Sequence, residues 1–171
     1  NSQELNIIYT PLHGTGNLPI RRLLSELGYK NVFVVKEQEN PDGDFPTAPY
    51  PNPENPKVFN IALELAKDTN PDIILGTDPD CDRIGVMAKG STGEYKLLTG
   101  NEVGVLLSHY ILASLKEKKE LPSNGAVIKT IVTTDMVKPI CRDFGIEVLE
   151  VLTGFKYIGE LIENLDEKKF I

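Results

Sequence analysis

The sequence predicts an α/β fold built from two consecutive small domains, each a mixed sheet flanked by helices. Short β-branched apolar runs alternate with segments whose apolar residues recur at helical spacing, an order typical of sheets covered by helices. A polar hairpin at residues 89–94 interrupts this alternation, and a long apolar helix opens a second block after it. We therefore expect one domain at residues 1–97 and a second at residues 98–171.

The first block begins with a strand–helix–strand unit. An apolar run at residues 5–9 predicts a strand, and apolar residues at helical spacing over 18–27 predict a helix that Gly28 ends. A β-branched run at 32–35 predicts the next strand. Because few residues separate these elements, we expect them to form a βαβ unit.

A proline-rich segment, residues 41–56, comes next and holds six of the chain's 12 prolines. Each proline lacks an amide donor and fixes φ, so the segment can form neither a helix nor a central strand, and a surface loop or linker is predicted. Beyond it, helical spacing at 58–66 predicts a helix that ends before Pro71. Apolar runs at 73–76 and 84–88 predict two further strands.

The second block repeats the alternation of helices and strands. Its apolar pattern predicts helices at 103–115, 136–144 and 156–164 and strands at 126–128 and 148–151. A further strand begins at residues 168–171, where the sequence stops. We therefore expect the second domain to be incomplete and the chain to be a piece of a larger protein.

The overall composition excludes several classes of function. A formal charge of -7, 40% hydrophobic and 25% charged residues are typical of a globular protein. The acidic balance, without a Lys/Arg cluster, argues against nucleic acid as a partner, and no apolar run is long enough for a membrane span. Two widely spaced cysteines favour a reduced, cytoplasmic setting.

Three carboxylates, Asp78, Asp80 and Asp82, follow directly after a buried type of strand. In an extended strand they would span about 13 Å, which is too wide for one ion. Pro79 and the nearby Gly76 favour a curled loop in which the three carboxylates converge. Converging carboxylates repel one another, and a hard divalent cation with oxygen ligands relieves that repulsion. The pattern therefore indicates an Mg²⁺ site.

Two familiar acidic motifs fit this spacing less well. An EF-hand loop starting at Asp78 would need Gly and Glu where Arg83 and Lys89 stand. The phosphatase motif DxDx[TV] of haloacid-dehalogenase-like enzymes is matched only by residues 80–84, with Ile84 in the last position. A solvated acidic turn remains an alternative, but Arg83 is a planar donor suited to phosphate.

Two short turns between a strand and a helix are candidate substrate contacts. The turn at residues 12–17 carries His13 and two glycines, although Pro19 replaces the third glycine of a dinucleotide motif. A structural role for His13 is the alternative. In the other turn we expect Thr153 to cap a helix whose first turn carries Lys156. A lysine there opposes the helix dipole, which a negative ligand would offset; an exposed lysine without a ligand is the alternative.

Five segments occur in an order that resembles one enzyme family. They are YTPLHGTGN at 9–17, PDGDFPTAPYPNPENP at 41–56, GTDPDCDRIGV at 76–86, LLTGNEVGVLL at 97–107 and LTGFKYIG at 152–159. Together they resemble the α-D-phosphohexomutase superfamily, the phosphoglucomutase and phosphomannomutase enzymes, whose members have four domains around a central cleft. The resemblance covers essentially the whole chain, and implies the second domain, which binds the metal, and most of the third.

The resemblance also implies roles for individual residues. The metal ligands implied for Mg²⁺ are Asp78, Asp80 and Asp82. The residues implied to act on the phosphoryl group are Arg83 and, more weakly, Lys156. The implied contacts to the sugar phosphate are Thr153, Gly154, Lys156 and Arg83, and we add His13 from its turn.

The implied activity interconverts a sugar 1-phosphate and a sugar 6-phosphate through an enzyme phosphoserine and a bisphosphorylated sugar. Glucose is the expected sugar, with mannose or pentose as alternatives within the family. The serine segment of the first domain and the phosphate loop of the fourth domain are not found in the sequence, nor is the GEES-like sugar loop of the third domain. The first and fourth domains are therefore expected partners, and the fragment is expected to be inactive alone. A haloacid-dehalogenase-like phosphatase and a non-catalytic metal- or sugar-phosphate-binding module stay open as alternatives.

Overall fold

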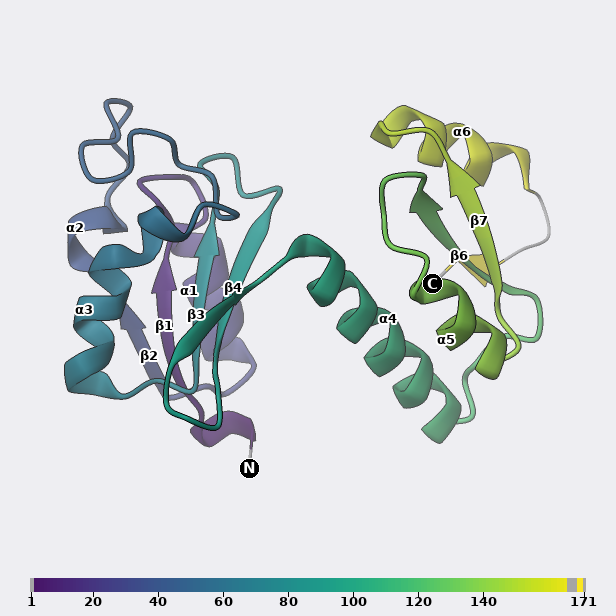
Figure 1. Cartoon of the computed structure of the whole chain (residues 1–171), viewed down its shortest axis with the longest axis horizontal. Coiled ribbons are helices and arrows are strands. Elements are labelled where there is room, and N and C mark those ends of the chain that lie inside the picture. Colours follow the sequence, from purple (N-terminus) through teal and green to yellow (C-terminus); the bar gives the residue numbers. More distant parts are fainter. Residues whose placement is uncertain (1, 166–168, 171) are drawn as a thin grey trace. The chain divides into compact units, whose positions relative to one another are not determined.

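The structure is a computed structural model that describes residues 2–165 and 169–170. The chain divides into two compact units, Asn1–Gly100 and Asn101–Ile171, which we call unit 1 and unit 2 (Figure 1). Each unit is a sheet with helices packed against it, and each is described by itself below. The predicted class, two consecutive α/β domains, is confirmed.

Unit 1 contains a five-stranded mixed sheet in the order β2-β1-β3-β4-β5. The strands are β1 (Asn6–Thr10), β2 (Asn31–Val34), β3 (Ile73–Thr77), β4 (Ile84–Lys89) and β5 (Tyr95–Leu98). β1 pairs in parallel with both β2 and β3, whereas β3, β4 and β5 form antiparallel pairs. The central strands carry the β-branched and aromatic residues that favour strands.

Helices lie on both faces of the unit 1 sheet, with α1 on one side and α2 and α3 on the other (Figure 1). The helical elements are η1 (Ser2–Glu4), α1 (Asn17–Glu26), α2 (Lys36–Glu39), η2 (Pro56–Phe59) and α3 (Asn60–Thr69). β1, α1 and β2 form the predicted βαβ unit. Gly28 ends α1 as predicted, because its positive φ of 87° lets Tyr29 N donate back to Leu24 O.

The core of unit 1 lies between the sheet and α3. Buried residues of three strands meet residues of η2, α3 and the proline-rich segment; the cluster includes Ile8, Ile74, Met87, Ala48, Val58, Phe59 and Ala62. The proline-rich segment is therefore part of the folded unit. It has no regular strand or helix between residues 40 and 55, in agreement with its proline content.

Besides the single 3-10 turn η1, the helix α2 and the strand β5 of unit 1 were not predicted from the sequence. The short helix α2 has the sequence KEQE, which offers no apolar spacing to recognise. β5 lies where we placed the boundary, and its run Tyr-Lys-Leu-Leu is too short to stand out by pattern alone. The predicted apolar face of α1 is also partly exposed, since the side chains of Leu18 and Leu23 are 75% and 50% accessible.

Unit 2 contains three described strands that run parallel in the order β7-β6-β8. Its elements are α4 (Gly100–Glu117), β6 (Gly125–Thr130), α5 (Val137–Asp143), β7 (Glu147–Val151), α6 (Phe155–Asn164) and β8 (Lys169–Phe170). The core joins α4, α5 and the strands through Leu112, Val127, Val137, Cys141 and Ile146. Residues 168 and 171 of the predicted last strand lie outside the described residues. In the part of the chain that is described, no helix combines the length and hydropathy that a bilayer crossing needs.

Replacing Ile8 by alanine is expected to lower the free energy of unfolding of unit 1 by about 2–5 kcal/mol, because it leaves a cavity in the core. Ile8 is fully buried on β1, which lies between β2 and β3 in the sheet. Urea denaturation followed by circular dichroism measures the change. Leu18→Ala on the exposed side of α1 is the control, with an expected change within about 0.5 kcal/mol. Equal losses in the two variants would contradict the assignment of the core.

Candidate metal centre

The three predicted aspartates lie together in the acidic loop, residues 78–83, which joins β3 to β4. Thr77 and Ile84 face each other as the last pair of these two antiparallel strands, so the loop closes a hairpin. Asp78, Asp80 and Asp82 each offer a carboxylate oxygen, and the three oxygens lie within 4.8 Å of one another. The arrangement is the curled one, in which a single ion can reach all three carboxylates.

A tight turn at Cys81 gives the acidic loop its curvature. Cys81 has a positive φ of 63°, and its amide donates to the carbonyl of Asp78 over 3.0 Å. A left-handed conformation at a residue with a side chain is uncommon and has an energetic cost. The Cys81 thiol points toward Gly16, with Sγ 2.9 Å from the position that a β-carbon on Gly16 would occupy. The sulfur therefore packs against the neighbouring turn.

Arg83 holds the innermost carboxylate of the acidic loop. Asp78 is fully buried and accepts two hydrogen bonds from Arg83, one from the backbone amide at 2.9 Å and one from Nε at 2.7 Å. Burial raises the pKa of Asp78, but these hydrogen bonds and the positive charge of Arg83 outweigh it, so the net pKa is lowered. Asp78 is thus an ionised carboxylate with a fixed orientation.

The other two carboxylates are exposed and repel each other. The negative charge of Asp80 is the largest cause of a raised pKa at Asp82, and the charge of Asp78 adds to it. Three carboxylates with converging oxygen atoms form a hard, all-oxygen donor set, which fits Mg²⁺ and leaves room for water or phosphate oxygens. The residues present therefore fit the divalent cation expected from the sequence.

The glycine turn, residues 12–17, packs directly against the acidic loop. A β-carbon on Gly14 would lie 2.3 Å from Cα of Pro79, and one on Gly16 would lie 2.6 Å from the Tyr9 hydroxyl and 2.7 Å from Thr77 Oγ1. Tyr9 and Thr77 themselves share a buried hydrogen bond of 2.8 Å. Both glycines are needed because the two chain segments approach more closely than any β-carbon permits. Residue spacing alone did not reveal this role of Tyr9 and Thr77.

A second pair of glycines lets the proline-rich segment reach the sheet below the acidic loop. Gly76 and Gly85 are cross-strand partners on β3 and β4. A β-carbon on Gly76 would lie 2.7 Å from the Phe59 ring, and one on Gly85 would lie 2.2 Å from the carbonyl oxygen of Pro53. The glycines that flank the acidic motif in the sequence thus allow two other segments to pack against its base.

His13 connects the glycine turn to the proline-rich segment. It is 5% exposed, and its Nδ1 and Nε2 lie 3.2 Å from Asn40 O and 2.9 Å from Thr47 Oγ1. Because a carbonyl only accepts, Nδ1 carries the proton in the neutral ring, and Thr47 then donates to Nε2. Both ring nitrogens are engaged within unit 1, so the structure gives His13 a structural role.

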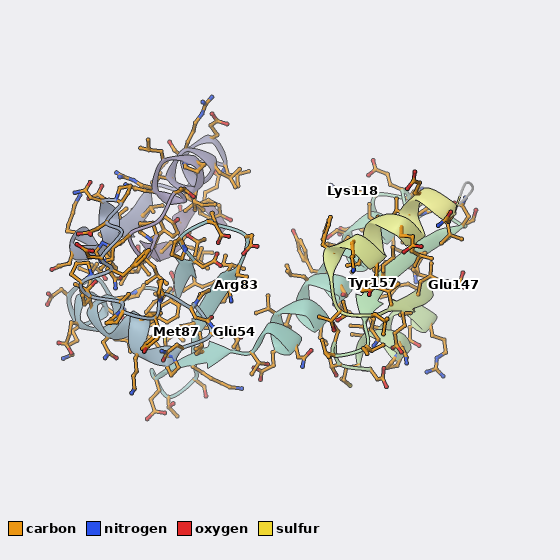
Figure 2. All side chains as sticks on the ribbon, turned by 90° about the horizontal axis from the view of Figure 1, so that it is seen from above. Glu54, Arg83, Met87, Lys118, Glu147 and Tyr157 are labelled. Atoms are coloured by element: carbon orange, nitrogen blue, oxygen red, sulfur yellow. The ribbon has the colours of Figure 1, made fainter. Side chains whose placement is uncertain are left out.

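The remaining predicted site residues, Thr153, Gly154 and Lys156, belong to unit 2. They lie where β7 ends and α6 begins. The prediction that Thr153 caps this helix is wrong: α6 starts at Phe155, its cap position is Gly154, and no side chain caps it. Gly154 has a φ of 136°, which favours glycine there. Lys156 lies in the first helical turn, and its Nζ is 4.9 Å from the ring centroid of Tyr157. Figure 2 labels Tyr157, and also Arg83 of unit 1.

An ion-pair cluster that we did not predict lies at the same end of the unit 2 sheet. Lys129 is 5% exposed, and its ammonium contacts Glu150 at 2.5 Å and Asp135 at 3.4 Å and donates to two backbone carbonyls of the 130–133 turn. Lys138 also contacts both carboxylates. The hydrogen bonds from Lys129 and Lys138 lower the pKa of Glu150. The cluster fixes the turn after β6 beside the strand that leads to Thr153.

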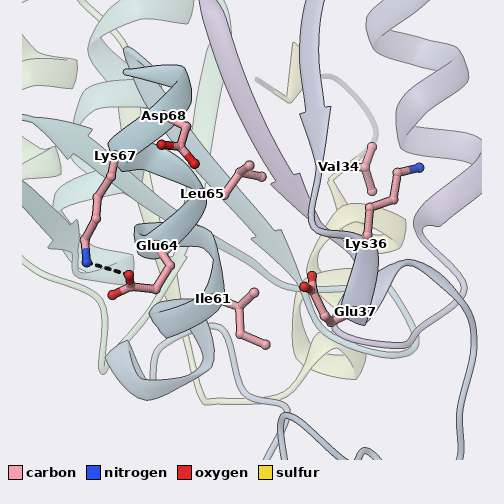
Figure 3. Close-up of a pocket in the computed structure, with 8 residues that line it drawn as sticks. All are labelled: Val34, Lys36, Glu37, Ile61, Glu64, Leu65, Lys67 and Asp68. Atoms are coloured by element: carbon pink, nitrogen blue, oxygen red, sulfur yellow. Dashed lines mark hydrogen bonds and ion pairs between the residues drawn. The ribbon is translucent and has the colours of Figure 1, made fainter.

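A groove on unit 1 is separate from these residues (Figure 3). Its volume is about 500 Å³, and it lies between α2 and α3 with apolar residues at its centre and charged residues around them. Its lining consists of Val34, Lys36, Glu37, Ile61, Glu64, Leu65, Lys67 and Asp68, of which Lys67 and Glu64 form an ion pair. None of these residues belongs to the acidic loop or the glycine turn.

The fold and the acidic loop together define a pair of α/β/α domains with a candidate divalent-cation site. Residues 1–92 match the family model described as phosphoglucomutase/phosphomannomutase, alpha/beta/alpha domain II, and residues 99–169 match the one for domain III. The chain belongs to the phosphoglucomutase/phosphomannomutase family, and the resemblance noted from its motifs is confirmed.

Individual relatives give the same result. The chain is 36% identical over 164 residues to a phosphoglucomutase of Staphylococcus saprophyticus, covering 96% of this chain and 29% of that protein. A crystal structure of a phosphoglucomutase/phosphomannomutase family protein from Burkholderia thailandensis has the same fold, with a TM-score of 0.72 at 22% identity, covering 94% of this chain and 32% of that one. The N-acetylphosphoglucosamine mutase of Aspergillus fumigatus, crystallised with GlcNAc-6P and magnesium, gives 0.61 at 16% identity, covering 98% and 32%. The chain thus spans about a third of these relatives.

Replacing Gly14 by alanine is expected to displace the acidic loop and to lower the free energy of unfolding by about 1–3 kcal/mol, because the new methyl group has no room beside the Pro79 backbone. Gly43→Ala is the matched control. Nothing lies within 4 Å of a β-carbon at Gly43, so that change should be close to neutral. Urea denaturation measures both variants, and a Gly14→Ala protein as stable as wild type would contradict the close packing.

Replacing Glu150 by glutamine tests the ion-pair cluster through pH. Because Lys129 and Lys138 lower the pKa of Glu150 in the folded state, its contribution is present above the pKa of the unfolded chain and is lost as pH falls through the folded pKa. We expect Glu150→Gln to be less stable than wild type at pH 7, with a difference that shrinks on acidification.

Urea midpoints measured between neutral and acidic pH give this difference. Glu163→Gln, an exposed position on α6, serves as the control and should follow the wild-type pH dependence. A difference between Glu150→Gln and wild type that stays constant with pH would contradict the ion-pair account.

Proposed function

We propose that the intact protein is a phosphosugar mutase that interconverts a sugar 1-phosphate and a sugar 6-phosphate, with glucose as the sugar. The observation that carries the proposal is the convergence of Asp78, Asp80 and Asp82 next to Arg83, in a chain whose two parts match the second and third domains of this family. We keep residues 1–97 as the metal-binding domain and residues 98–171 as part of the third domain.

The three aspartates would hold the Mg²⁺ ion of the enzyme. Their oxygens lie close enough to share one ion, and the magnesium in the Aspergillus mutase structure supports the choice of cation. When bound, Mg²⁺ supplies positive charge that stabilises negative charge on a phosphoryl group. Asp78 presents one buried, oriented carboxylate, and the exposed Asp80 and Asp82 complete the set.

Arg83 acts on the phosphoryl group from the same loop. Its side chain is 56% exposed, and the hydrogen bond from the side chain to Asp78 uses Nε. Its terminal guanidinium nitrogens can therefore donate to a phosphate oxygen while Nε stays on Asp78. This contact stabilises negative charge in the transition state and holds the phosphoryl group in line between donor and acceptor.

In unit 2, the turn with Thr153, Gly154 and Lys156 would contact the sugar phosphate. Gly154 has no side chain to cap α6, so backbone amides at the start of this helix can donate to an anion. The Lys156 ammonium can pair with a phosphate. We assign His13 to holding the proline-rich segment and no longer to the substrate, because both its ring nitrogens are engaged.

The reaction needs groups that we place in the first and fourth domains of the intact enzyme. A serine phosphate transfers its phosphoryl group to the free hydroxyl of the sugar phosphate, which gives a bisphosphorylated sugar and a free serine. After the sugar reorients, its other phosphate returns to the serine, so that phosphate is conserved.

Sugar phosphates are charged metabolites of the cell interior, so we place the enzyme in the cytoplasm. The alternatives are a haloacid-dehalogenase-like phosphatase, a non-catalytic binding module, and mannose or pentose as the sugar.

The test uses the full-length protein encoded by the same gene. Incubated with glucose 1-phosphate, Mg²⁺ and a trace of glucose 1,6-bisphosphate, it is expected to form glucose 6-phosphate, which phosphorus NMR detects directly. Asp80→Asn should lower kcat/KM by at least about tenfold, because one charged metal ligand is lost. Asp68→Asn, at an exposed position on α3 away from the acidic loop, is the control and should leave activity unchanged.

The products separate the alternatives. Release of inorganic phosphate in place of isomerisation would favour the phosphatase. Conversion of only mannose or pentose phosphates would show that glucose is not the sugar substrate. A full-length protein that binds sugar phosphate and converts none of these substrates would be a binding module, and the proposal would be wrong.

A further inference from the structure

Thr15 of the glycine turn contacts the backbone of the acidic loop at Pro79. Both its amide and its hydroxyl donate to the carbonyl oxygen of Pro79, over 2.8 Å and 3.0 Å. Pro79 stands between the two metal candidates Asp78 and Asp80, so this carbonyl belongs to the peptide unit that leads into Asp80. One residue of the glycine turn thus holds the backbone between two ligands through two hydrogen bonds.

The acidic loop needs such a restraint because repulsion between its carboxylates favours a more open loop. The carboxylates converge to within 4.8 Å, and the charge of Asp80 acts on Asp82. Asp78 is fixed by Arg83, whereas Asp80 lies on the exposed outer part of the loop. Without the hydrogen bonds to the Pro79 carbonyl, repulsion would move Asp80 outward, away from the other two carboxylates.

The position of Thr15 is itself fixed on both sides. Gly14 lies against Pro79, and Gly16 lies against Tyr9, Thr77 and the Cys81 thiol, each with no room for a β-carbon. Thr15 is exposed, so its hydroxyl bond adds little to global stability. An effect of this hydrogen bond is therefore to be sought in the local geometry of the acidic loop and not in global stability.

We propose that Thr15 is a positioning residue of the metal centre, whose hydroxyl holds the Pro79–Asp80 peptide so that Asp80 stays within reach of the cation bound by Asp78 and Asp82. The inference rests on the proposed metal site and extends it to a residue 63 positions before Asp78 in the chain. It predicts that cation affinity depends on the hydroxyl of Thr15, while folding of the unit does not.

The experiment titrates the 171-residue chain with Mn²⁺ as a probe for the hard divalent cation and measures free Mn²⁺ by electron paramagnetic resonance. Thr15→Val removes the hydroxyl and keeps the shape, and we expect about fivefold weaker binding, the size of one lost hydrogen bond. Thr15→Ser restores the hydroxyl and should bind within about twofold of wild type, the scatter between preparations. Urea denaturation of the metal-free proteins should show equal stability.

A matched control is available in the same unit. Thr69 donates its hydroxyl to the carbonyl of Leu65 over 2.9 Å, at the end of α3. Thr69→Val therefore removes the same kind of hydrogen bond from a place outside the acidic loop. Its Mn²⁺ affinity should equal that of wild type.

The outcomes separate this inference from the metal site on which it rests. If wild type binds Mn²⁺ and Thr15→Val binds equally well, the inference is wrong and the metal site stands. If Thr69→Val weakens binding as much as Thr15→Val, the effect is general and the inference is also wrong. If Asp80→Asn binds Mn²⁺ as tightly as wild type, the metal site itself is misplaced, and the inference is lost with it.

Discussion

The close approach of the glycine turn to the acidic loop is the contact on which the rest of the site depends. Three carboxylates held within 4.8 Å of one another repel, so an isolated loop would open. Two contacts oppose the repulsion. Arg83 neutralises and orients the buried Asp78, and the glycine turn packs against Pro79 more closely than any side chain would allow. The geometry of the acidic loop is thus supported both by the Arg83 side chain and by the packing of the glycine turn.

This arrangement assigns a physical role to motifs that carry no reactive group. The two glycines of the glycine turn make room for the acidic loop, and the cross-strand pair Gly76 and Gly85 makes room for Phe59 and the proline-rich segment below it. His13 of the glycine turn then contacts Thr47 of the proline-rich segment through Nε2 and the carbonyl of Asn40, just before that segment, through Nδ1. The phosphoryl transfer that we propose would require such a preset geometry at its cation site, since catalysis of that kind consists mostly of positioning and charge stabilisation.

Sequence patterns sufficed for the features that depend on local chemistry. β1, α1 and β2 follow from apolar spacing and from Gly28, a residue type that ends helices because it adopts a positive φ easily. The acidic loop follows from three alternating aspartates beside a proline. The short α2 and β5 were not predicted, because KEQE has no apolar residue and Tyr-Lys-Leu-Leu lacks the β-branched run that marks β2. The roles of Thr15 and Lys129 were not predicted for another reason. They come from contacts with residues distant in sequence, which residue spacing cannot reveal. Thr153 was misplaced as a helix cap because Gly154 can adopt a backbone angle that threonine avoids.

The most direct test of the central claim, that the acidic loop is the cation site, is the broadening of backbone amide resonances by substoichiometric Mn²⁺ in a ¹⁵N-labelled 171-residue chain. The account predicts that broadening centres on residues 78–83 and extends to residues 14–16 of the glycine turn, which lie against Pro79 and Cys81. Excess Mg²⁺ should reverse it at the same residues. Broadening that centres on other acidic side chains, such as Glu64 and Asp68 of α3, and leaves the acidic loop sharp would contradict the account.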